Sequence, residues 1–133
     1  MDNAPAMNHR TVLAWGAALG ATGVALGAFG AHALQPLLSV GQNREYWETA
    51  SRYQLVHAAV LVGFAAWLRG SPLPPAASAA WAARLWIVGT VLFSGSLYLL
   101  CWFGPHYLWL ATPLGGLCLL AGWTLAGAAA LRA

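Results

Sequence analysis

The sequence predicts an all-α integral membrane protein, a bundle of four transmembrane helices with both termini in the cytoplasm. Of the 133 residues, 60% are hydrophobic and only 7% are charged, whereas charged residues make up about a quarter of soluble domains. The apolar residues also gather into runs of about twenty or more, the length that crosses a hydrocarbon core of about 30 Å as a helix. We expect one transmembrane domain, residues 1–133, with spans at about 11–34, 47–68, 81–103 and 106–131.

The first predicted span, residues 11–34, contains no Asp, Glu, Lys or Arg. A cleaved signal peptide is the competing interpretation, because Arg10 precedes the run and Ala31-His32-Ala33 has the pattern of a cleavage site. The run is, however, longer than the apolar region of about 7 to 15 residues that signal peptides carry. We therefore expect a retained transmembrane helix.

The second predicted span, residues 47–68, is the apolar run that also carries Glu, Arg, Gln, Tyr and His. The segment before it contains Pro36 and Gly41, which favour a turn. Ser39 followed by Gln42 matches a capping box, so this helix is expected to begin near Val40. Helical spacing gives it an inward face made of Thr49, Tyr53, His57, Val60 and Phe64, with Gln54 at the flank.

Proline and glycine delimit the last two predicted spans. Residues 69–75, with the sequence RGSPLPP, end the second helix, and Gly104-Pro105 divides the third span from the fourth. Pro113 lies inside the fourth span, where it is expected to kink the helix.

The arginines predict the orientation, since cytoplasmic loops carry the excess of basic residues. On the side of the termini lie Arg10, Arg69, Arg84 and Arg132, and on the other side lie Arg44 and Arg52. Both termini are therefore expected in the cytoplasm. Tryptophans near the predicted helix ends, Trp47 and Trp86 among them, are expected to anchor the helices at the membrane surfaces.

A polar cluster is predicted near the middle of the membrane from Tyr53, Gln54, His57, Ser94 and Tyr98. At about 1.5 Å per residue, His57 lies on the order of 15 Å from Trp47 along the helix. A polar group needs a hydrogen-bond partner at that depth, so we expect a neutral His57 bonded to Tyr53, Ser94 or Tyr98. Three roles stay open for His57: joining helices, moving a proton, ion or small solute, and ligating haem or another cofactor.

A second polar group, formed by His32, Glu48 and Arg52, is predicted at the outer membrane surface. Glu48 and Arg52 are four residues apart and can pair along one side of a helix. His32 has two candidate partners, Glu48 and His106.

Two stripes of small residues are predicted to let helices pack closely. The first span contributes Gly16, Gly20, Gly23, Gly27 and Gly30, and the fourth contributes Gly115 and Gly122. In lipid, such residues allow backbones to approach and to pack by van der Waals contact. The stripes can join helices within one bundle or join copies of the chain.

Several other functions are disfavoured. The net charge of +3 is small and scattered, unlike a nucleic-acid surface. Cys101 and Cys118 lack the spacing of a zinc site. Haem would need a second axial ligand at the depth of His57, and no acid is placed to orient His57 for catalysis. We therefore expect no enzyme activity, metal or cofactor; the expected partners are the lipid bilayer and a second copy or a membrane complex.

Four motifs resemble one known family. They are GAFGAHAL at residues 27–34, WETASRYQLVHA at 47–58, GTVLFSGSLY at 89–98, and TPLGG at 112–116 with the later Gly122-Trp123. They resemble the YgdD-like family of small inner-membrane proteins, the domain of unknown function 423. The resemblance implies a multi-pass protein of the bacterial inner (plasma) membrane without an established activity. The positions that match the family pattern are Gly27, Phe29, Gly30, His32, Tyr53, Gln54, His57, Ser94, Gly95, Ser96, Tyr98, Pro113, Gly115 and Gly116.

Taken together, the residues and the resemblance predict a structural or accessory inner-membrane protein, or a subunit of a membrane complex. The alternative is a transporter or channel component for a proton or small solute that uses the polar cluster around His57.

Overall fold

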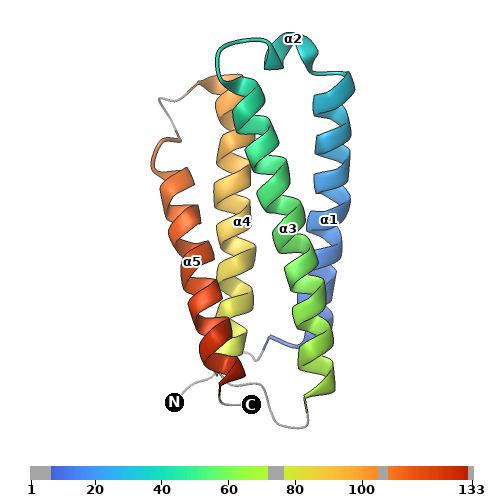
Figure 1. Ribbon diagram of the computed structural model, residues 1–133, viewed down its shortest axis with the longest axis vertical. Coiled ribbons are helices and arrows are strands. Elements are labelled where there is room, and N and C mark those ends of the chain that lie inside the picture. The colour runs from blue at the N-terminus through green and yellow to red at the C-terminus, as the bar shows by residue number, and fades with distance from the viewer. Residues whose placement is uncertain (1–6, 72–76, 105–107, 132–133) are drawn as a thin grey trace.

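The computed structural model describes residues 7–71, 77–104 and 108–131, and every regular element in these ranges is a helix. The helices are α1 (His9–His32), α2 (Gln35–Leu38), α3 (Asn43–Gly70), α4 (Ala77–Phe103) and α5 (Ala111–Ala130). The four long helices run antiparallel to their neighbours, and α2 joins α1 to α3 at the end of the molecule opposite the start of α1 (Figure 1). The predicted all-α class is confirmed.

Within the described residues, three helices are long and apolar enough to cross a membrane: α1, α4 and α5. The remaining long helix, α3, has 28 residues. Its lower hydropathy has a local cause, because Glu48, Arg52, Gln54 and His57 interrupt an otherwise apolar sequence.

The long helices lie in chain order, with α3 between α1 and α4 and with α5 on the far side of α4 (Figure 1). Among the described residues, extensive contact between long helices is confined to these successive pairs. In its apolar segment 50% of the residues of α4 are buried, against 22% for α1 and for α5. The helix α4 is therefore central, while α1 and α5 turn most of their side chains outward.

The ends of α1 and α3 differ from the prediction. Asn8 caps α1, since its Oδ1 accepts a hydrogen bond from the Thr11 amide at 2.9 Å, and α1 consequently starts two residues before the predicted span. The capping box at Ser39 and Gln42 is wrong. The Ser39 hydroxyl donates to the Pro36 carbonyl at 2.8 Å, which closes α2, and α3 begins only at Asn43.

Pro113 does not kink a helix. It is the third residue of α5, in the first turn, where a backbone N–H would have no partner within the helix. Proline is tolerated there, so Pro113 lies in the first turn of α5 without bending the helix. The predicted start of the span at His106 lies outside the described residues, as do Arg132 and the prolines of residues 72–75.

The glycines of α1 lie mostly against α3. A Cβ atom built on Gly16 would come within 3.1 Å of the Ala58 carbonyl oxygen, and one on Gly30 would meet the indole of Trp47. The remaining members of the stripe differ: Gly23 is equally tight, Gly20 leaves ordinary van der Waals space, and Gly27 meets nothing within 4 Å.

The glycines of α5 lie against α4. A Cβ atom on Gly122 would come within 2.7 Å of Trp86 Cδ1, and one on Gly115 would meet the backbone of Phe93. The carbonyl oxygen of Gly89 in α4 lies 2.9 Å from the Cβ position built on Gly115, so the backbones of α4 and α5 are in close contact here. Both stripes thus serve contacts within the chain, with Gly27 as an exception.

Candidate functional site

The five residues of the predicted polar cluster fall into two groups. Gln54 and Tyr98 share one hydrogen-bonded network, while His57 and Tyr53 belong to another. Ser94 is 2% exposed, and its hydroxyl has no hydrogen-bond partner among the described atoms. Of the three predicted partners of His57, Tyr53 is confirmed through its backbone carbonyl, whereas His57 forms no hydrogen bond with Ser94 or Tyr98 of the third span in the described part of the chain.

The first group, here called the Gln54 network, consists of Gln54, Thr22, Ser51 and Tyr98 and joins α1, α3 and α4. Nε2 of Gln54 donates to the Leu19 carbonyl at 2.9 Å and to Thr22 Oγ1 at 2.8 Å. Oε1 of Gln54 accepts from the Tyr98 hydroxyl at 3.0 Å, and this hydroxyl lies 3.1 Å from Ser51 Oγ. Gln54 is only 4% exposed, so its amide is bonded on both sides inside the protein.

The direction of each hydrogen bond in the Gln54 network follows from its chemistry. Since Tyr98 gives its one hydroxyl hydrogen to Gln54, Ser51 must be the donor to Tyr98. Thr22 accepts from Gln54 and donates to the Ala18 carbonyl at 2.8 Å. Each side-chain hydrogen therefore has an acceptor, and the network ends on the backbone of α1. A network satisfied in this way holds the three helices in register.

The second group joins α3 to α5 through His57. Nε2 of His57 lies 3.2 Å from the indole nitrogen of Trp123, and Nδ1 lies 2.9 Å from the Tyr53 carbonyl oxygen. An indole N–H can only donate. Nε2 must therefore accept, and the ring hydrogen must sit on Nδ1, where it donates to the carbonyl. This geometry requires a neutral imidazole, in agreement with the sequence prediction.

Trp123 also connects His57 to the aromatic core. Its ring meets the His57 ring edge-on with centroids 6.2 Å apart, and it meets the Trp86 ring edge-on at 5.1 Å. Trp86 in turn packs against Phe64 of α3 at 5.2 Å. The histidine is thus held by aromatic packing as well as by its two hydrogen bonds.

A groove of about 600 Å³ runs beside His57 between α3, α4 and α5. Its walls are mainly aliphatic and aromatic, and Tyr53 lines it with 42% of its surface exposed. The predicted inward position of Tyr53 is therefore wrong. Since α3 packs on α1 and α4 at once, its buried face is centred on Gln54, and Tyr53 turns to the groove, where its ring lies 4.6 Å from that of Phe93.

Two tryptophans expected at the membrane surfaces are buried instead. Trp47 is 4% exposed and Trp86 is 1% exposed. The Trp47 indole nitrogen donates to the Leu26 carbonyl at 2.9 Å, and its ring lies 4.6 Å from that of Tyr98. These large side chains fit inside because Gly30 and Gly122 leave room beside them.

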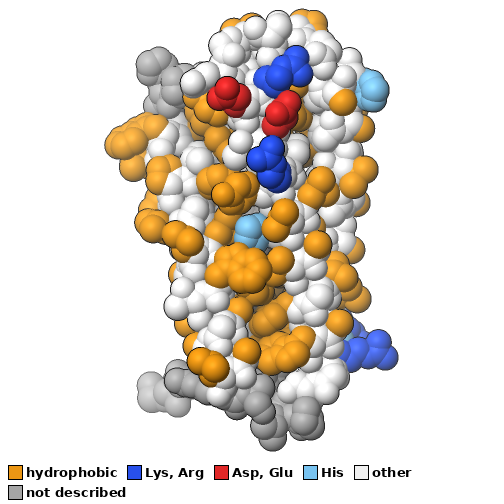
Figure 2. All heavy atoms as spheres, viewed as in Figure 1, with side chains coloured by type: hydrophobic (Ala, Val, Ile, Leu, Met, Phe, Trp, Pro, Cys, Tyr) orange, Lys and Arg blue, Asp and Glu red, His pale blue; other side chains and the backbone are white. Residues whose placement is uncertain are grey.

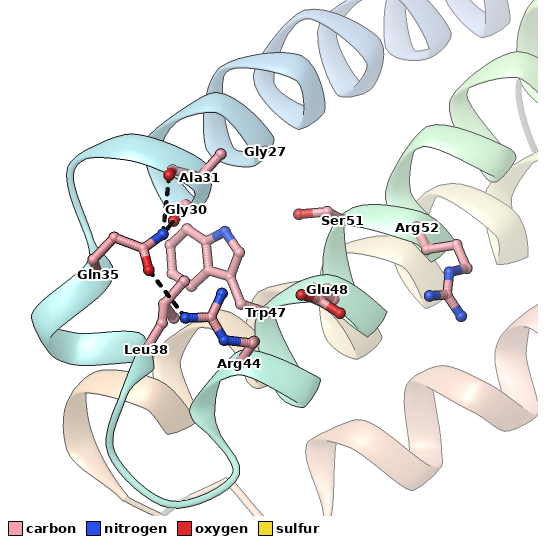
Figure 3. Close-up of a pocket in the computed structure, with 10 residues that line it drawn as sticks. All are labelled: Gly27, Gly30, Ala31, Gln35, Leu38, Arg44, Trp47, Glu48, Ser51 and Arg52. Carbon is pink, nitrogen blue, oxygen red and sulfur yellow. Dashed lines mark hydrogen bonds between the residues drawn. The ribbon is translucent and has the colours of Figure 1, made fainter.

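The group predicted at the outer surface does not form its expected pairs. His32, Glu48 and Arg52 are all exposed. Glu48 and Arg52 lie on successive turns of α3 with no hydrogen bond between them (Figure 3). In the described part of the chain, His32 forms no ion pair with Glu48, and its other candidate partner, His106, lies outside the described residues.

Glu48 and Arg52 instead line a pocket of about 520 Å³ between α1, α2 and α3, here called the α2-end pocket. Arg44 lines the same pocket and donates from Nη2 to Gln35 Oε1 at 3.0 Å. Figure 2 shows acidic and basic side chains gathered near the α2 end of α3, with hydrophobic side chains scattered over the remaining face and further basic side chains at the lower right. This end of the molecule therefore carries an unusual concentration of charge for the chain.

Sequence reasoning missed Thr22, Ser51 and Trp123. Thr22 and Trp123 each adjoin a glycine of a predicted stripe, Gly23 and Gly122, and this position was the available signal for them. Ser51 lies one helical turn before Gln54 and adjoins no glycine stripe. Among the described residues, no three His, Cys, Asp or Glu side chains are placed to share a metal ion.

Comparison with known proteins gives a consistent result. The family described as protein of unknown function (DUF423) matches residues 26–116. The UPF0382 inner membrane protein YgdD of Escherichia coli strain K12 is 38% identical over 128 residues, which cover 95% of this chain and 93% of the relative. A UPF0382 membrane protein of Staphylococcus haemolyticus is 38% identical over 102 residues, or 77% of this chain and 80% of the relative. No solved structure matches the chain.

Proposed function

The chain belongs to the DUF423 family of small inner-membrane proteins, and from this premise we propose that it acts as a structural or accessory protein of the bacterial inner membrane. In this proposal α1, α3, α4 and α5 all cross the bilayer and form one transmembrane domain over residues 1–133. Both termini are cytoplasmic, and the protein works as a homo-oligomer or as a subunit of a membrane complex.

The proposed crossing of α3 is supported by the partners of its polar residues. Burying an amide or an imidazole in hydrocarbon is unfavourable by several kcal/mol when the group is unpaired. Gln54 is hydrogen-bonded to Leu19, Thr22 and Tyr98. His57 is hydrogen-bonded to Tyr53 and Trp123. The features that lower the hydropathy of α3 are thus compatible with a position inside the bundle.

The observation that carries the proposal is the Gln54 network. Its side-chain hydrogens are all given to acceptors within the protein, on three different helices. A transport site would instead present donors or acceptors to a solute along a water-filled route. The groove beside His57 is lined mainly by apolar side chains, and both ring nitrogens of His57 are already bonded. This arrangement favours joining helices over moving a solute, and we assign no catalytic role to it.

Mass spectrometry of the protein purified in mild detergent tests the proposal. We expect a defined homo-oligomer or a complex with a stoichiometric membrane partner. A monomer that carries protons into liposomes, and loses this flux in His57→Ala while keeping its thermal stability, would contradict the structural role.

A further inference from the structure

We propose that the α2-end pocket binds the headgroup of a zwitterionic phospholipid of the phosphoethanolamine type. In this assignment the guanidinium group of Arg52 binds the phosphate, and the carboxylate of Glu48 binds the ammonium group. The proposal goes beyond the structural role above and concerns a different part of the molecule from the Gln54 network.

Small residues make up part of the lining of the pocket. Gly27, Gly30, Ala31 and Ser51 line the approach of α1 to α3. A Cβ atom on Gly27 would meet nothing within 4 Å, in contrast to Gly16, Gly23 and Gly30 of the same helix. The glycine stripe of α1 therefore packs tightly against α3 at those three positions and leaves open space at Gly27.

The charged side chains of the pocket are aligned. Arg44, Glu48 and Arg52 are spaced by four residues on α3, which places them along one side of the helix at intervals of about 6 Å. Arg44 is held in place by Gln35, whose Nε2 donates to the carbonyls of Gly30 and Ala31 at the end of α1. Figure 3 shows this chain of contacts from α1 through Gln35 to Arg44.

Glu48 and Arg52 are left without a protein partner in the described part of the chain. A carboxylate and a guanidinium that do not pair with each other are both available to a ligand. Guanidinium groups bind phosphate oxygens in a bidentate manner. The adjacent negative and positive charges of Glu48 and Arg52 thus match a ligand that carries both an ammonium and a phosphate group.

The position of the pocket relative to the membrane points to a lipid as the source of that headgroup. At about 1.5 Å per residue α3 extends over roughly 42 Å, longer than a hydrocarbon core of about 30 Å. Its first turns, with Arg44 and Glu48, then lie among the headgroups. This step rests on the proposed crossing of α3, which reporter fusions test independently of any lipid.

Apolar surface continues from the pocket toward the middle of the helices. Val24 lies one turn from Gly27 on α1, and Leu55 lies one turn from Ser51 on α3. Val24 is 63% exposed and Leu55 is 37% exposed. Acyl chains attached to a headgroup in the pocket would lie against these side chains.

Glu48 determines the lipid class. An anionic lipid such as phosphatidylglycerol offers a phosphate for Arg52 but no cation for the carboxylate of Glu48, which would also repel the phosphate. Replacing Glu48 by Gln should therefore change the preference between the two lipids as well as the affinity.

The test measures apparent dissociation constants from the thermal unfolding of the full chain in mild detergent, titrated with short-chain phosphatidylethanolamine or phosphatidylglycerol. We expect wild type to prefer phosphatidylethanolamine by about tenfold, the effect of one charge-assisted hydrogen bond. Glu48→Gln should abolish this preference. Glu45→Gln is the matched control, since Glu45 is exposed nearby on α3 but does not line the pocket.

Two further variants separate binding from folding. Arg52→Gln should weaken both lipids about tenfold. Gly27→Leu should block the pocket without loss of fold, because its side chain enters open space; the unfolding midpoint without lipid verifies this. Any one of three results would overturn the proposal. They are equal affinity of wild type for both lipids, a Glu48→Gln variant that behaves like Glu45→Gln, and full affinity in Gly27→Leu. Binding of free phosphoethanolamine as tight as that of the lipid would overturn the assignment of a membrane lipid.

Discussion

The indole nitrogen of Trp123 donates a hydrogen bond to Nε2 of His57 across 3.2 Å. This contact ties α3 to α5, two helices that otherwise meet mainly through α4 in the described part of the chain. It also fixes the tautomer of His57, because the ring must accept at Nε2 and donate at Nδ1.

Trp123→Phe tests this contact, since phenylalanine keeps an aromatic ring beside Trp86 and removes the donor. We expect the free energy of unfolding to fall by about 1 kcal/mol, the size of hydrogen bonds between helices in membranes. Reversible unfolding in mixed micelles measures the change. Trp15→Phe is the control, because Trp15 is 43% exposed and its indole has no hydrogen bond in the described part of the chain; equal effects of the two changes would contradict the account.

Two glycines of α1 should respond oppositely to alanine. Gly30→Ala forces the indole of Trp47 to move, and overpacking of this kind lowers stability by about 1 to 3 kcal/mol. Gly27→Ala enters open space and replaces glycine in a helix, which favours the folded state by roughly 0.5 to 1 kcal/mol. Thermal unfolding of the two variants decides the matter, and a loss of stability in Gly27→Ala as large as in Gly30→Ala would refute this packing.

The proposed topology predicts the behaviour of reporter fusions. A fluorescent protein that folds only in the cytoplasm should fluoresce at either terminus. Alkaline phosphatase, which is active only outside the cytoplasm, should be active when inserted after Gly41 in the exposed turn between α2 and α3. Fluorescence at one terminus alone would mean that the number of membrane crossings is odd.

The structural role of His57 predicts the outcome of a flux assay. Liposomes that contain the wild-type protein should show the same proton leak as liposomes that contain His57→Ala. The variant should instead unfold at a lower temperature, because the Trp123 donor and the Tyr53 carbonyl lose their partner. Proton flux that depends on His57 would contradict this role.

The lengths of the helices and much of the close packing could be predicted from the sequence. Apolar runs and breakers located the four long helices, and the glycine spacing identified Gly16, Gly23, Gly30, Gly115 and Gly122 as close contacts. Both signals are local, since they depend only on the spacing of residues along one helix.

The partners across helices could not be predicted in the same way. The predicted spans place His57 and Ser94 at a similar depth in the membrane, but depth does not determine the rotation of a helix about its axis. Because α3 packs on α1 and α4 together, its buried face centres on Gln54, and His57 turns toward Trp123 of α5. Trp47 was likewise expected at a surface, and the space that Gly30 leaves for it belongs to another helix.

A double-mutant cycle between Gln54 and Tyr98 measures whether polar side chains inside the bundle join its helices. The measurement compares the unfolding free energies of wild type, Gln54→Leu, Tyr98→Phe and the double variant in mixed micelles. We expect a favourable coupling of about 0.5 to 2 kcal/mol between the two side chains. A coupling near zero would contradict the claim that the Gln54 network holds the helices together.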